Sequence, residues 1–188
     1  MTSATRIGAL GMMVVCLAAC QNSAQVVDGY KILQSVVESK GVTKLSCGAK
    51  LGCDFERIDD VAVIDEETKR PTATAIEQGL VRIEGSVFSP THEYALSITE
   101  GDHEIAVRFY PVSVERAERF HLIHNFQANH RYQLQMYRQR DEVGQSLLSV
   151  AAPGKLCVDL QQDEIAIRRF CRSYDVLTGL GEFVEQGI

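Results

Sequence analysis

The stretch LSITEGDHEIAVRFY, residues 96–110, decides the fold that the sequence predicts. Along its second half, apolar residues occupy every other position: Ile105, Val107 and Phe109. Successive side chains of a strand point to opposite faces, so this period of two indicates strands with one buried face. The sequence Glu100-Gly101-Asp102 interrupts the alternation and is typical of a hairpin turn.

The same alternation continues on both sides of this stretch. Residues 120–137, FHLIHNFQANHRYQLQMY, form two alternating runs around a turn at 128–130, and shorter apolar runs cover 81–85, 147–151 and 156–160. Strands at this spacing, apolar on one side and polar on the other, favour an antiparallel β-sandwich. We therefore expect a mainly β domain over residues 42–188.

One segment has a helical period instead. Between residues 26 and 40, large apolar side chains recur at steps of three and four, and Gly41 follows as a stop signal. They are Val26, Tyr30, Leu33 and Val37. This pattern predicts an amphipathic helix over residues 26–41 whose apolar stripe docks either on the domain or on a membrane surface. The segment lacks the Lys/Arg-rich polar face expected of a membrane-lying helix.

The first twenty residues have the layout of an export signal. A single cation, Arg6, precedes the uncharged run 7–19, which is too short to span a bilayer core of about 30 Å. The run ends in Leu17-Ala18-Ala19-Cys20. An ordinary secretory signal or an uncleaved anchor is the alternative explanation of this layout.

The Leu-Ala-Ala-Cys sequence resembles the lipobox of bacterial lipoproteins. That resemblance implies cleavage after residue 19, acylation of Cys20 and a short polar spacer over residues 20–25. It also implies outer-membrane sorting on the periplasmic face, because Gln21 replaces the aspartate that marks inner-membrane retention. Each buried methylene of an acyl chain contributes about 0.8 kcal/mol, and more than one chain makes anchoring stable.

Charge and cysteine content fit that location. The formal net charge is −6, which argues against nucleic-acid binding. If residues 1–20 are processed as the lipobox implies, four cysteines remain for disulfides: Cys47, Cys53, Cys157 and Cys171. Local pairing, Cys47 with Cys53 and Cys157 with Cys171, is favoured because the intervening loops are short. A metal or redox pair is the competing interpretation, but neither pair has CxxC spacing.

A second resemblance concerns residues 96–137. A Gly-x-His turn, an alternating strand and a later Phe-x-Ala-x-x-x-Tyr run are similar to PEGA-like small envelope β-sandwich modules. The matching residues are Gly101, His103, Ile105, Val107, Phe126, Ala128 and Tyr132. The resemblance implies a surface-associated module without catalytic residues.

Three histidines, His121, His124 and His130, are the candidate metal ligands. In a strand, His121 and His124 point to opposite faces, which opposes convergence on one ion. We expect no metal, no cofactor and no enzymatic activity. A periplasmic metal-binding protein or enzyme that uses these histidines is the alternative.

The C-terminal segment carries apolar residues that could contact a partner: Leu177, Leu180, Phe183 and Val184. A closing element packed on the sandwich and a frayed end are the other interpretations. Together these features predict an outer-membrane-anchored envelope lipoprotein with a non-enzymatic structural or partner-binding role. Its expected partners are the membrane, through the acyl chains, and an unidentified envelope protein.

Overall fold

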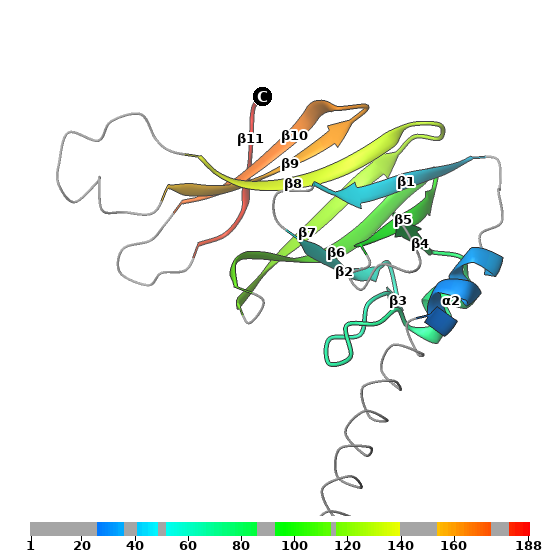
Figure 1. Cartoon of the computed structure of the whole chain (residues 1–188). Helices are drawn as coiled ribbons and strands as arrows, with labels where there is room; N and C mark the ends of the chain where they lie inside the picture. Colours follow the sequence, from blue (N-terminus) through cyan, green and yellow to red (C-terminus); the bar gives the residue numbers. More distant parts are fainter. Residues whose placement is uncertain are drawn as a thin grey trace, which may run out of the picture.

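The computed structural model describes residues 26–35, 41–48, 52–85, 93–113, 116–139, 154–173 and 181–188 (Figure 1). The chain is mainly β and forms two sheets with few helices, so the expected sandwich-like fold is confirmed. Three predicted site residues, Cys20, Leu177 and Leu180, lie outside the described residues, as does Val37 of the predicted helix.

The larger sheet has seven strands. Their spatial order is β11 (Val184–Gln186), β10 (Ile165–Arg172), β9 (Lys155–Gln162), β8 (Arg131–Gln139), β1 (Val42–Cys47), β5 (Glu93–Thr99) and β4 (Val81–Glu84). Neighbouring strands are antiparallel, except that β1 runs parallel to β8. The sheet is thus antiparallel in the main, with one parallel pair that alternation of side chains cannot reveal.

The smaller sheet has four strands in the order β3 (Val61–Ala62), β2 (Cys53–Ile58), β6 (Gly101–Ser113) and β7 (Arg116–Phe126). The inward faces of both sheets contribute to one core of buried side chains. Its largest fully buried apolar members include Phe55, Phe109, Phe120, Phe126 and Tyr132. The predicted alternation therefore marks the buried face correctly in β7. In β6 it finds the apolar core face, but the opposite face is buried too, since Ala106 is 4% and Arg108 1% exposed.

The predicted hairpin at Glu100-Gly101-Asp102 is wrong. Strand β5 belongs to the seven-stranded sheet and β6 to the four-stranded one, so this turn is a corner between sheets. The turn at 128–130 is a second such corner, between β7 and β8. Both corners use positive φ values, +124° at Gly101 and +65° at Asn129. Gly101 pairs with Phe126, so the two corners lie at the same end of the sandwich.

Residues 26–35 form a helix, as predicted, beside the short helix α2 (Ala73–Glu77), whose N-cap Thr72 accepts a hydrogen bond from Ala75 N. The 26–35 helix contacts the domain through Asp28 and Ile32, which are buried. Its predicted stripe does not pack on the domain, because Val26, Tyr30 and Leu33 are exposed. Within the described residues, no helix has the length and apolar content needed to cross a membrane.

Candidate functional site

The C-terminal segment forms an edge strand. Strand β11 pairs antiparallel with β10, from Cys171 opposite Val184 to Arg169 opposite Gln186, and all three of its residues are exposed. Just before it, Phe183 packs edge-on against Phe120, with ring centroids 5.4 Å apart. Of the two candidate contact residues that the structure describes, Phe183 therefore packs against the core and Val184 faces solvent.

Two arginines of β10 connect this segment to the edge of the smaller sheet. Arg168 donates to the backbone oxygen of Ile123 in β7 over 2.6 Å and also forms a two-bonded ion pair with Glu185. Arg172 forms a 2.8 Å ion pair with Glu118 of β7. The β7 edge is thereby partly covered by side chains, whereas all three residues of β11, at the end of the other sheet, are exposed.

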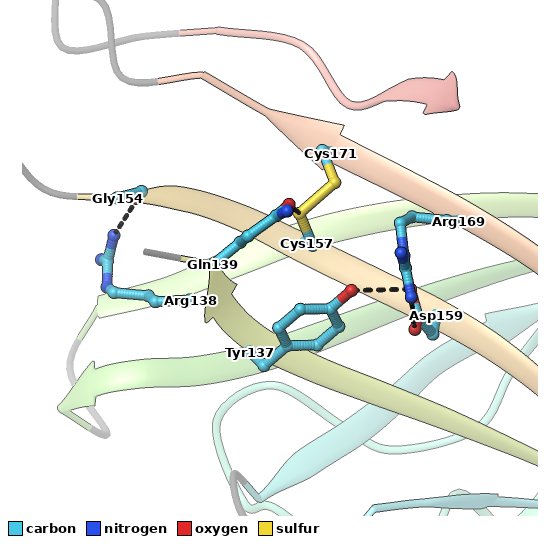
Figure 2. The surroundings of a disulfide bond; sticks show 8 residues. All are labelled: Tyr137, Arg138, Gln139, Gly154, Cys157, Asp159, Arg169 and Cys171. Atoms are coloured by element: carbon cyan, nitrogen blue, oxygen red, sulfur yellow. Dashed lines mark hydrogen bonds and ion pairs between the residues drawn. A yellow bond between two sulfur atoms is a disulfide. The ribbon is translucent and has the colours of Figure 1, made fainter. Parts of the chain in front are cut away.

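A disulfide stiffens the two strands behind β11. Cys157 of β9 is bonded to Cys171 of β10, as the short loop predicts, with their Cα atoms 4.1 Å apart (Figure 2). On the same pair of strands, the buried carboxylate of Asp159 accepts two hydrogen bonds from Arg169 and one from Tyr137. Burial and this carboxylate raise the pKa of the Tyr137 hydroxyl, so it stays protonated and donates.

The second expected disulfide is also present. Cys47, the last residue of β1, is bonded to Cys53, the first residue of β2, with a Cα separation of 6.1 Å. Since β1 and β2 belong to different sheets, this bridge fastens one sheet to the other. Neither bonded pair is available to a metal in this state.

The three candidate histidines do not converge. His121 is on the outer face of β7 with a side chain 60% exposed, whereas His124 faces inward against Phe126 and Tyr132. Burial, followed by the nearby Arg168, lowers the pKa of His124. His130 lies at the corner and pairs with Asp163 over 2.5 Å. In the described part of the chain, no group of three or more His, Cys, Asp or Glu side chains could hold a metal ion.

Sequence reasoning missed two arrangements that we call clasps. In the first clasp, Asp59 accepts from Glu104 N over 2.9 Å through Oδ1 and contacts His103 Nδ1 over 2.7 Å through Oδ2. Burial alone would raise the pKa of Asp59, but the hydrogen bonds from His103 and Glu104 outweigh it and lower the pKa. The clasp holds the β2–β3 turn against the start of β6.

The second clasp repeats this geometry at the other corner. Asp163 Oδ1 accepts from Arg131 N over 3.0 Å, and Oδ2 contacts His130 Nδ1. Hydrogen bonds from Arg131 N and His130 lower the pKa of Asp163. The aspartate and histidine of each clasp are far apart in the chain, by 44 positions in the first and 33 in the second. The only local sequence signal for a clasp is therefore an aspartate in a turn.

The first clasp borders a cavity of about 370 Å³ lined mainly by β5 and by residues 77–80 at the end of α2. Its His103 Nε2 lies 3.2 Å from Thr99 Oγ1, so both ring nitrogens of His103 have partners. When an aspartate, a histidine and a hydroxyl are linked in this order by hydrogen bonds, the histidine can activate the hydroxyl as a nucleophile. Here Asp59 also binds backbone and has the left-handed φ of +48°, which makes the trio a fastening of the corner.

Among the described residues, the geometry identifies two exposed features, the β11 edge and the outer face of the 26–35 helix. No protein-family model matches the chain, and no curated protein or solved structure matches it either.

Proposed function

We propose that this protein is an outer-membrane-anchored envelope lipoprotein with a non-enzymatic role, in which the β-sandwich binds a partner protein of the envelope. The Leu17-Ala18-Ala19-Cys20 sequence supports the anchor, and Gln21 supports sorting to the outer membrane. The described domain begins at residue 26, so the acylated cysteine and the folded part are close in the chain.

The single observation that carries the binding role is the exposed edge strand β11. An edge strand presents unpaired backbone groups, to which an extended segment of another protein can add as a further strand. Natural proteins commonly cover or blunt such edges, as Arg168 and Arg172 do for β7. Strand β11 has no comparable cover within the described residues, and the Cys157–Cys171 bridge holds its template strand β10 rigid.

The alternative, a periplasmic metal-binding protein or enzyme, draws no support from the histidines. His121 is exposed on one face of β7, His124 is half-buried on the other, and His130 lies apart from both at the corner, beside Asp163. Three ligands so arranged cannot meet at one ion.

The anchor is tested by replacing Cys20 with alanine. We expect the wild-type protein to incorporate labelled palmitate and to fractionate with the outer membrane. The Cys20→Ala variant should lose the label and the membrane association, because the thiol is the acylation site. Unchanged membrane association without label would contradict the lipoprotein proposal.

The binding role is tested by photocrosslinking in the native envelope. A photoreactive residue at Val184, which is 61% exposed on β11, should give a discrete crosslinked product. Val112, 69% exposed near the end of β6, is the matched control, because it has the same side chain and similar exposure. Equal crosslinking from both positions, or none from Val184, would remove β11 as the binding edge.

A further inference from the structure

The 26–35 helix presents an apolar surface that the domain does not cover. Four large apolar side chains, which we call the outer stripe, are exposed: Val26 by 48%, Val27 by 51%, Tyr30 by 64% and Leu33 by 58%. On the opposite side, Ile32 is 1% exposed and packs into the core. The helix is therefore apolar on both sides, and only one side has a protein partner among the described residues.

The distribution of charge on this helix is also uneven. Its single carboxylate, Asp28, is turned inward, where Arg70 donates to Oδ2 through two nitrogens at 2.8 and 2.6 Å. Lys31 and Gln34 are exposed as well, and both border a cavity that the helix shares with Arg70 and α2. The exposed surface of the helix thus combines apolar groups, one cation and no anion, which suits the boundary between lipid headgroups and acyl chains.

We propose that the outer stripe lies in the interfacial region of the bilayer that holds the Cys20 acyl chains, an inference that rests on the proposed lipoprotein function. Val26 lies six positions after Cys20, and at about 3.6 Å per position this stretch reaches at most about 22 Å. A tether this short keeps the stripe at high local concentration beside the membrane. The anchor therefore supplies the attraction that a Lys/Arg-rich face supplies in untethered interfacial helices.

This placement leaves the proposed binding edge free. In Figure 1, β11 lies on the far side of the sandwich from α2 and the helix beside it. A domain resting on the bilayer through the outer stripe would hold β11 away from the lipid. The stripe and the acyl chains together fix the orientation of the sandwich, which the acyl chains alone would leave free.

The chain contains no tryptophan, so a single introduced tryptophan reports its own surroundings. We would place acylated Tyr30→Trp protein on vesicles of phosphatidylethanolamine and phosphatidylglycerol whose acyl chains carry bromine, a fluorescence quencher. The emission of Trp at position 30 should shift to the blue and lose most of its intensity. Acylated Val112→Trp, on the β6–β7 hairpin away from the helix in Figure 1, is the control and should show neither effect.

A second variant separates burial in lipid from tethering alone. Leu33→Asp in the Tyr30→Trp background puts a carboxylate on the outer stripe, and position 33 is exposed, so the fold is not at risk. The protein should remain acylated and bound to vesicles, but its tryptophan should return to water-like emission and escape quenching.

Each other outcome has a definite meaning. An acylated, vesicle-bound protein whose Trp at position 30 is water-exposed and unquenched overturns the inference and leaves the lipoprotein proposal intact. A blue-shifted but unquenched tryptophan together with a dimer in sedimentation also overturns it, because a second copy then covers the stripe. Failure of acylation overturns the proposed function itself and is detected separately, by mass or palmitate label.

Discussion

The two clasps fasten their corners with the same set of hydrogen bonds, yet they are built in opposite chain order. Asp59 precedes His103, whereas Asp163 follows His130. In both, the aspartate has a left-handed φ, +48° and +49°, and its own N–H donates to the carbonyl of the residue after the histidine, over 2.7 and 2.8 Å. The reversed order shows that the same local geometry arises twice without a tandem sequence repeat.

The clasps differ in their surroundings. The His103 side chain is 16% exposed, while the His130 side chain is 35% exposed. Both clasps border a cavity, the first through His103 and the second through Asp163. In each clasp, a disulfide-bonded cysteine lies six positions before the aspartate, Cys53 before Asp59 and Cys157 before Asp163. The comparison teaches that equal hydrogen bonds at unequal depth should contribute unequally to stability.

The largest effects are expected from the two disulfides. The Cys157–Cys171 bridge spans 14 residues and the Cys47–Cys53 bridge spans 6. On the loop-entropy model, replacing both cysteines of the longer bridge with alanine should cost about 3 kcal/mol, and of the shorter about 2 kcal/mol. Urea unfolding followed by circular dichroism measures both. If the shorter bridge proved more important, its joining of the two sheets would outweigh loop length.

The next effect comes from the clasp aspartates. Asp59→Ala removes two hydrogen bonds and the left-handed preference of aspartate, and it should destabilise the fold by about 1.5 kcal/mol. Asp163→Ala should cost less, because the second clasp is more exposed and better screened by water. Asp60→Ala, at the exposed neighbouring position, is the control for loss of charge. Equal losses at positions 59 and 163 would show that depth does not matter here.

The strands were predictable because their signal is local. The alternation at 105–109 and 120–126 depends only on neighbouring residues. It marks the buried face of β7 correctly and the core face of β6, but it misses that Ala106 and Arg108 on the other face of β6 are buried as well. Which sheet a strand joins depends on distant partners, so the corner at residues 100–102 was misjudged as a hairpin. The clasps were missed for the same reason.

The 26–35 helix shows a different limit. Its period was readable, but the choice of buried face was not, because counting apolar side chains favours Val26, Tyr30 and Leu33. The fold instead buries the side that carries Ile32 and Asp28, since Arg70, far along the chain, satisfies the carboxylate. A buried charge with a remote partner leaves no trace in a local pattern.

A smaller effect is expected in acid. Both clasp carboxyls have a pKa below the ordinary value of 3.8, so the unfolded chain binds protons more readily than the folded one. Their stabilisation is complete above pH 3.8 and is lost as the pH falls below it. The melting temperature of the wild type should therefore fall more steeply in acid than the melting temperature of an Asp59→Asn, Asp163→Asn double variant. Parallel declines would mean that the clasp carboxylates are not the groups that titrate.

The smallest effect concerns His124, which pairs with His103 across β6 and β7 but has no clasp. Burial lowers its pKa below 6.5, and Arg168 adds to the effect, so protonation favours the unfolded chain as the pH falls below 6.5. In a His124→Gln variant, the free energy of unfolding should fall less steeply with pH between pH 6.5 and pH 3.8 than in the wild type. His121→Gln, on the exposed face of the same strand, is the matched control for the substitution itself. A histidine buried in the sandwich thus titrates against the fold, and an equal slope change in both variants would show that the burial of His124 is not the cause.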